Sequence, residues 1–143
     1  MISLKSLHEM TPMQVHQLYK LRVDVFVAEQ NCPSNEIDDH DAAPETRHLL
    51  AFDGETLAGC ARVFPTENGS RFGRFVVHPD FRGSGLGPEI VRTGIEYTER
   101  FDGDLIVEAQ SGLVSYYEQF GLVAEGDEFL DTGVPHKTMR LAR

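Results

Sequence analysis

Residues 82–87, Arg-Gly-Ser-Gly-Leu-Gly, have the composition and spacing of an anion-binding turn. A largely apolar run at 72–77 ends at His78-Pro79 just before them, so the pattern predicts a strand, a glycine turn and the start of a helix. The first N–H groups of a helix have no intrahelical acceptor, and the helix dipole adds partial positive charge there. Because glycine has no Cβ to block an approaching anion, we predict that this turn binds a phosphate.

Two other phosphate-binding motifs fit this turn poorly. A P-loop ends in Gly-Lys followed by Ser or Thr, whereas this turn ends in Gly87-Pro88. A dinucleotide-binding Gly-x-Gly-x-x-Gly motif would place its third glycine at Pro88. The sequence therefore disfavours ATP and NAD as ligands.

The motif Arg82-x-x-Gly85-x-Gly87 after a strand ending Val76-Val77-His78-Pro79 resembles the pyrophosphate-binding signature of the GNAT acetyltransferases, which use acetyl-CoA. Residues 105–121, LIVEAQSGLVSYYEQFG, resemble the next strand and helix of that family. Residues 18–41, 46–50 and 133–136 resemble its ElaA-like branch. The resemblance covers nearly the whole chain.

This resemblance implies an α+β fold, the GNAT acyl-CoA N-acyltransferase fold, with a mixed central sheet of about six or seven strands and flanking helices. In that fold two neighbouring strands splay apart, and the pantetheine of the cofactor enters the splay and bonds to exposed strand backbone. The expected co-substrate is acetyl-CoA, without a metal. Its binding residues are expected to be Phe75, Val76, Val77, Arg82, Gly83, Ser84, Gly85, Leu86 and Gly87, with Arg71 and Arg74 as further sources of positive charge.

Tyr117 lies four residues before Gly121, where many GNAT members keep a tyrosine that protonates the departing CoA thiolate. A phenol with a pKa near 10 can hold a proton beside a thiolate whose pKa is near 8.5. Leu113, Tyr117 and Phe120 also share helical spacing, so a packed core aromatic is the alternative. Tyr116 is a second candidate, and because neighbouring helix positions point about 100° apart, only one of the two can face the thiol.

An amine acceptor must lose a proton before it attacks the thioester, which calls for a base or a water chain leading to one. Glu108 and Gln110 fall on one face of the predicted strand at 105–110, so Glu108 is the candidate base and Gln110 a candidate acceptor contact. A solvated carboxylate is the alternative for Glu108. Histidine exchanges protons near neutral pH, so His48, His78 and His136 are further candidates, each with a structural alternative.

The acidic segment around residues 29–41 is the candidate acceptor side, where carboxylates would attract a cationic amine. Its alternative is a solvated loop. Within the stretches that resemble the ElaA-like branch, the expected acceptor-binding residues are Gln30, Asp38, Asp41 and His48.

The elements that must position these residues can be read from caps and turns. Thr11, Pro12 and Gln14 form the start of a helix, with Thr11 as N-cap and Gln14 as its capping-box partner. Pro88 falls in the first turn of the helix that begins near Gly85, where its missing N–H breaks no intrahelical bond. Ser111 is expected to cap a short helix at 112–120. The expected strands are 2–8, 47–52, 57–64, 72–78, 105–110, 122–127 and 136–142, with turns at Asp53-Gly54 and Asn68-Gly69.

Length and charge limit the remaining classes. A chain of 143 residues, 41 % of them apolar, fits one domain at 1–143. The formal charge of −10 disfavours nucleic-acid binding. No run approaches the roughly 18 apolar residues of a membrane span, and the first residues lack signal-peptide features, so we expect a cytoplasmic protein without a membrane partner. Cys32 and Cys60 lack metal-ligand spacing and are expected to be free thiols.

The sequence therefore predicts an acyltransferase that moves acetyl from acetyl-CoA directly to an amine within a ternary complex. The acceptor is a small molecule or a peptide, and the apolar helix faces are compatible with a homodimer. Two alternatives stay open: a non-catalytic acyl-CoA-binding module that regulates a partner, and transfer of a longer acyl chain.

Overall fold

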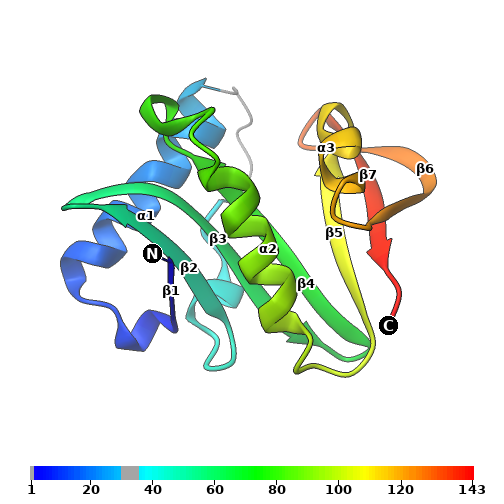
Figure 1. Cartoon of the computed structure of the whole chain (residues 1–143), viewed down its shortest axis with the longest axis horizontal. Coiled ribbons are helices and arrows are strands. Elements are labelled where there is room, and N and C mark those ends of the chain that lie inside the picture. Colours follow the sequence, from blue (N-terminus) through cyan, green and yellow to red (C-terminus); the bar gives the residue numbers. More distant parts are fainter. Residues whose placement is uncertain (1, 30–35) are drawn as a thin grey trace.

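The structure of the chain is a computed structural model that describes residues 2–29 and 36–143. Within these residues, seven strands form one mixed sheet in the order β1-β2-β3-β4-β5-β7-β6 (Figure 1). All neighbouring pairs are antiparallel except β4 and β5, which are parallel. The strands are β1 (Ile2–Lys5), β2 (Arg47–Asp53), β3 (Thr56–Thr66), β4 (Gly69–Val77), β5 (Asp104–Gln110), β6 (Val123–Asp131) and β7 (Val134–Leu141).

Helices cover the two faces of this sheet. Helix α1 (Pro12–Val23) continues as the π-helical segment η2 (Asp24–Glu29), and both pack on one face through the apolar cluster that includes Leu50, Cys60 and Val76. Helices α2 (Leu86–Thr98) and α3 (Val114–Glu118) pack on the other face through a second cluster. The residues of that cluster alternate along the strands with those facing α1, as a strand period of two requires. The predicted fold class is confirmed.

The start of α1 follows the predicted capping box. Thr11 accepts a hydrogen bond from the N–H of Gln14 at 3.1 Å, and the Gln14 side chain accepts one from the N–H of Thr11 at 3.0 Å. The first strand ends at Lys5, earlier than His8, because Ser6 begins a 3₁₀ turn whose Glu9 side chain accepts the N–H of Ser6 at 2.8 Å.

The helix predicted at 112–120 is shorter than expected. A 3₁₀ turn, η5 (Ser111–Leu113), precedes α3, and neither element has a side-chain cap. The hydroxyl of Ser111 instead donates to the carboxylate of Glu128 at 2.8 Å, so the predicted capping role of Ser111 is wrong. The sequence signal was ambiguous because a serine hydroxyl can bond a distant carboxylate as readily as a local N–H.

Strands β4 and β5 pair over only three residues each. Gly69, Ser70 and Arg71 lie opposite Asp104, Leu105 and Ile106. Beyond these pairs the two strands diverge, and Figure 1 shows them meeting at one end and opening into a V at the other. The splay that the family resemblance implied is therefore present, and it leaves the β5-facing edge of β4 without ladder partners in the described residues.

No helix within residues 2–29 and 36–143 combines the length and the apolar character that crossing a bilayer requires.

Candidate functional site

A cavity of about 130 Å³ lies between the diverging ends of β4 and β5. Side chains from both faces of the sheet contribute to its lining. Phe72, Phe75 and Tyr117 come from the α2 and α3 face, because they pack with that face's core. Glu108 and Gln110 alternate with the core residues of β5 and therefore point to the opposite face. The cavity thus passes through the sheet where its ladder is interrupted.

The glycine turn leads directly into α2. Gly83 and Gly85 have φ values of +80° and +88°, and Gly85 is the N-cap residue of the helix. A Cβ at either position would meet no protein atom within 4 Å, so the space beside them is open. Leu86 and Gly87 are the first two helical residues, and their N–H groups have no acceptor within the helix. The turn therefore combines open space beside Gly83 and Gly85 with two helix-start N–H groups that have no acceptor within the helix.

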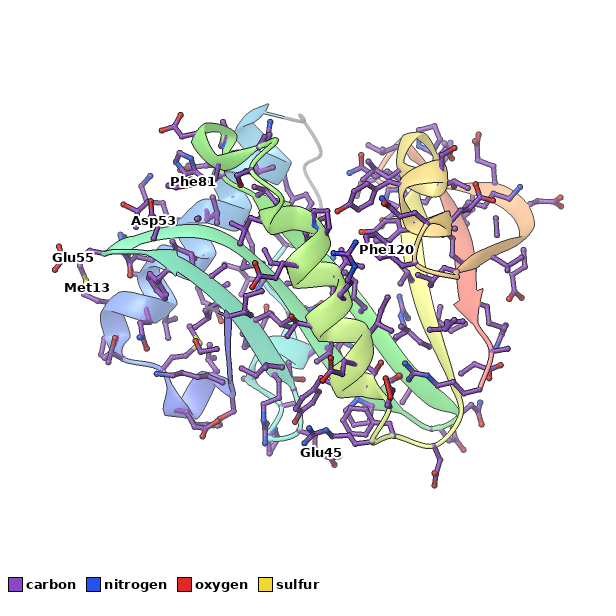
Figure 2. The ribbon with its side chains drawn as sticks, in the orientation of Figure 1. Met13, Glu45, Asp53, Glu55, Phe81 and Phe120 are labelled. Atoms are coloured by element: carbon purple, nitrogen blue, oxygen red, sulfur yellow. The ribbon has the colours of Figure 1, made fainter. Side chains whose placement is uncertain are left out.

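Other residues of the turn are engaged locally. The N–H of Ser84 lies 3.4 Å from the carbonyl oxygen of Phe81, and its hydroxyl donates to the same oxygen at 2.5 Å. Arg82 donates from Nε to the carbonyl oxygen of Val77 at 3.1 Å, which ties the turn to the end of β4. Figure 2 labels Phe81 beside the loop that leads into α2. Ser84 and Arg82 therefore shape the turn through these bonds.

Phe75, Tyr116 and Tyr117 form an aromatic group at the open end of the V. The ring of Phe75 lies 6.1 Å from that of Tyr116 and 6.4 Å from that of Tyr117. Tyr117 is 5 % exposed and lines the cavity, and burial raises the pKa of its phenol. The Tyr116 hydroxyl lies 3.1 Å from the position that a Cβ at Gly87 would occupy, so Tyr116 reaches across to the first turn of α2.

Figure 2 shows Phe120 between α2 and the part of the sheet formed by β5 and β7. The Arg92 guanidinium of α2 lies 5.6 Å from the centroid of its ring, so the segment that follows α3 contacts α2.

The predicted base Glu108 forms an ion pair. Its carboxylate lies 3.0 Å from the guanidinium of Arg71, close to the point where β4 and β5 part. Both side chains are more than a third exposed, so the pair is solvated. Arg71 therefore neutralises a carboxylate of the cavity wall and is not positioned as a free charge for a phosphate.

Three arginines pair with two aspartates of the acidic segment. We call this group the Arg-Asp clamp, and it consists of Arg22, Arg62, Arg74, Asp38 and Asp41. Arg22 donates to Asp41 at 2.8 Å, and Arg62 donates to Asp38 at 2.7 Å and to Asp41 at 2.9 Å. Arg74 lies 3.3 Å from Asp38. The clamp joins α1, the segment around η3 (Asp39–Ala42), β3 and β4. Its carboxylates are neutralised within the protein.

These contacts set the charge state of the clamp. Burial alone would raise the pKa of Asp38, but its hydrogen bond to Arg62 and the charges of Arg62 and Arg74 lower that pKa to about 2. Burial opposes ionisation of Asp41 as well, and the bond and charge of Arg22 with the charge of Arg62 bring its pKa below the ordinary value. Asp38 and Asp41 are therefore paired with arginines of the clamp, and the predicted attraction of a cationic amine by free carboxylates finds no support at these two residues.

Two predicted acceptor contacts lie away from the cavity. Asp41 is 1 % exposed and His48 is fully buried, and neither lines the cavity wall. The Nε2 of His48 lies 3.0 Å from the carbonyl oxygen of Asp41, and burial lowers the pKa of the imidazole. Both residues stabilise the clamp, so their predicted contact with an acceptor is wrong for this conformation. Gln30 lies outside the described residues.

The remaining predicted contacts differ in how they meet the cavity. Gln110 lines it directly. Asp38 reaches it through its partners, because Arg62 and Arg74 line the wall and are bound to Asp38. Cys60 is buried, and burial raises the pKa of its thiol to about 12, which leaves it inert as a nucleophile.

Sequence reasoning missed Arg22 and Arg62, which are almost fully buried. A signal for both was present. Arg22 lies four residues after Leu18 and three before Val25, so it occupies the core face of its helix. Arg62 lies between Cys60 and Phe64 on the face of β3 that packs against α1. A charged residue at a core position predicts a buried counter-ion, and the acidic segment supplies it.

Arg74 has a backbone conformation that is rare for a residue with a side chain. Its φ is +50°, and the pairing of β3 with β4 shifts at this point, which makes a β-bulge. The bulge lies at the residue before Phe75. It therefore determines which way the side chains from Phe75 to the end of β4 point relative to the gap between β4 and β5.

Comparison with known proteins agrees with this geometry. The acetyltransferase (GNAT) domain model matches residues 8–143. The chain is 39 % identical to a UPF0039 protein of Mycobacterium tuberculosis over 136 residues, which cover 87 % of this chain and 82 % of the relative. It is 30 % identical to the protein ElaA of Escherichia coli, over 95 % of this chain and 94 % of ElaA.

Solved structures extend the likeness to three dimensions. The crystal structure of an acyl-CoA N-acyltransferase from Pseudomonas aeruginosa superposes with a TM-score of 0.92 at 32 % identity, covering 99 % of each chain. Escherichia coli ElaA superposes with a TM-score of 0.88 at 28 % identity, over 98 % of this chain and 99 % of ElaA. With its glycine turn, its splayed sheet and these relatives, the chain belongs to the GNAT acetyltransferase family, in the branch that includes ElaA.

Proposed function

We propose that the protein is an N-acetyltransferase that transfers an acetyl group from acetyl-CoA directly to an amine in a ternary complex. The observation that carries this proposal is the cavity where the ladder between β4 and β5 is interrupted, together with the glycine turn that follows β4. A thioester placed in the gap would be open to a nucleophile from one face of the sheet while its CoA extends from the other.

The residues fit the parts of CoA. The space beside Gly83 and Gly85 is open, and the backbone N–H groups of Gly83, Gly85, Leu86 and Gly87 would bind the pyrophosphate there. Pro88 supplies no donor. Within the described residues the edge of β4 at Phe75–Val77 has no β5 partner, and Arg82 bonds the carbonyl oxygen of Val77. This edge would bond the amides of pantetheine as an added strand does. An amide near Val77 would stabilise the oxyanion that forms on the thioester carbonyl.

Two groups would serve the leaving thiolate and the attacking amine. Tyr117 is protonated at neutral pH, since burial raises its pKa, and it lines the cavity from the CoA side. Its phenol would protonate the thiolate as the C–S bond breaks. The amine would enter from the face that carries Glu108 and Gln110. No protein acyl intermediate is needed, in keeping with the inert, buried thiol of Cys60.

Calorimetric titration with acetyl-CoA tests the cofactor site, with NAD and ATP as controls. We expect micromolar binding of acetyl-CoA alone. Gly85→Val should weaken it at least about tenfold, because a side chain there fills the space meant for phosphate. Gly54→Val is the matched control, since Gly54 also has a positive φ, +61°, and open space, but lies in the β2–β3 hairpin. Equal weakening by both variants would show that backbone strain, and not phosphate contact, is responsible.

Release of free CoA in the presence of primary amines tests the transfer itself. Acetyl-CoA binding without turnover on any amine would contradict the proposal and support the non-catalytic acyl-CoA-binding module. Faster turnover with a longer acyl-CoA than with acetyl-CoA would replace the acetyl donor while keeping the transferase.

A further inference from the structure

The proposed transfer to an amine requires a group that takes a proton from the acceptor, and the following inference rests on that proposed function. An ammonium has no lone pair for attack until it loses a proton. Glu108, the base expected from the sequence, is ion-paired with Arg71 at 3.0 Å. One oxygen of the Glu108 carboxylate is therefore already engaged by the Arg71 guanidinium.

The structure separates the three candidate histidines. His48 is fully buried and does not line the cavity. His78 caps the 3₁₀ turn at Pro79–Phe81, where its Nδ1 accepts the N–H of Asp80 at 3.1 Å, and it too is absent from the cavity wall. His136 lines the cavity, together with Glu108 and Gln110.

The strand register places His136 on the acceptor face. Gln110 of β5 lies directly opposite His136 of β7, and Glu108 lies opposite Thr138. Residues that are directly opposite in an antiparallel pair point to the same side of the sheet. His136 therefore shares its side with Gln110 and Glu108, while Tyr117 packs with the core of the other side.

The hydrogen bonding of His136 fixes which nitrogen can act. Its Nδ1 lies 2.7 Å from the carbonyl oxygen of Val134. A carbonyl oxygen only accepts, so Nδ1 carries the hydrogen and the lone pair of the neutral ring is on Nε2. The ring is also held against Phe129, with their centroids 5.9 Å apart. We propose that Nε2 of His136 is the general base that deprotonates the amine acceptor.

The protons balance in this scheme. The acceptor ammonium has three protons on nitrogen, and the amide product keeps one. Nε2 of His136 takes one before attack, the nitrogen lone pair forms the C–N bond, and the C–S bond breaks as Tyr117 gives its proton to the thiolate. The second nitrogen proton and that of His136 pass to solvent, from which Tyr117 recovers its own. One proton is released for each acetyl group transferred.

His136→Asn tests the proposal. The Asn side-chain NH₂ can keep the bond to the carbonyl oxygen of Val134, whereas Asn has no atom in the place of Nε2. Two nucleophiles are compared: methylamine, which is protonated at neutral pH, and hydroxylamine, which is mostly not. We expect the rate of CoA release to fall about 100-fold with methylamine and only a few-fold with hydroxylamine. Added imidazole should restore much of the methylamine rate, and the affinity for acetyl-CoA should be unchanged.

His16→Asn on the exposed face of α1 is the control for loss of a histidine, and Glu108→Gln is the competing variant. Equal losses with both nucleophiles and no rescue would overturn the proposal, since a structural role affects both alike. A selective methylamine loss in Glu108→Gln instead of His136→Asn would assign the base to Glu108. Wild-type protein that binds acetyl-CoA but releases no CoA with either nucleophile would refute the proposed transfer, and with it the base.

Discussion

At the scale of single residues, Tyr117 is the proton donor that we propose for the CoA thiolate. It lines the cavity from the side of α2 and α3, and burial raises its pKa, so the phenol keeps its proton at neutral pH. The same burial makes the phenol a weaker acid. Proton transfer then depends on a thiolate that is itself desolvated beside it, which raises the basicity of the sulfur.

Tyr117→Phe should leave the dissociation constant of acetyl-CoA unchanged and lower turnover about 100-fold, because only the proton donor is removed. Calorimetry measures the first quantity and the rate of CoA release the second. Tyr116→Phe is the matched control on the neighbouring position of α3. If the loss appears in Tyr116→Phe and not in Tyr117→Phe, Tyr116 is the donor.

Sequence reasoning placed some of these residues and misplaced others for a physical reason. Gln110 and Glu108 line the cavity. Their shared face could be predicted because the alternation of side chains along a strand depends only on local sequence. The burial of Asp41 and His48 depends on Arg22 and Arg62, which come from distant segments. A pattern of acidic residues alone does not tell whether a carboxylate meets solvent or an arginine.

At the scale of elements, the Arg-Asp clamp joins segments that are distant in the sequence beside the cavity. Four segments meet there, and Asp41 bridges two arginines while itself 1 % exposed. The capping box of η3 is part of it, since Asp41 also accepts the N–H of Asp38 at 3.1 Å. The clamp therefore fixes the segment next to the cavity through charge and backbone bonds together.

Acid should destabilise the protein through this clamp. The folded pKa of Asp38 is about 2 and that of Asp41 is also lowered, whereas an unfolded Asp titrates near 3.9. A lowered folded pKa gives stability that is present above the unfolded value and is lost as the pH falls toward the folded one. We expect the urea midpoint, followed by circular dichroism, to drop between about pH 4 and pH 2.

Asp41→Asn should cost about 3–5 kcal/mol of unfolding free energy at neutral pH, because Arg22 and Arg62 lose a buried counter-charge. Asp38→Asn, which removes a more exposed partner, should cost less and still flatten the acid dependence. Wild-type stability in both variants, or an unchanged acid slope, would show that the clamp contributes nothing net.

Element boundaries were predicted best where local chemistry decides them. The caps of α1 and the glycine start of α2 agree with the sequence. The splay of β4 and β5 followed from family resemblance and not from any pattern in the strands, because the point where two strands stop pairing depends on contacts between segments that are distant in the sequence.

At the scale of the whole molecule, the net charge of −10 opposes the approach of a polyanionic cofactor. Salt screens this repulsion over about 10 Å at 0.1 M, while contacts within the glycine turn are shorter. The association rate of acetyl-CoA in stopped flow should therefore rise about twofold or more from low to physiological salt. Acetyl-pantetheine, which lacks the nucleotide phosphates, is the control and should show no such rise. An association rate of acetyl-CoA that falls as salt is added would mean that nearby arginines, and not the net negative charge, dominate the electrostatic field at the site.

The interrupted ladder also has a consequence for the order of events in catalysis. In the proposed arrangement CoA lies toward α2 and α3, and the amine arrives on the face that carries Gln110 and His136. Neither substrate has to pass the other on its way in, and neither product has to wait for the other on its way out. Such a site allows random addition and random release, so each substrate should dissociate from the ternary complex independently.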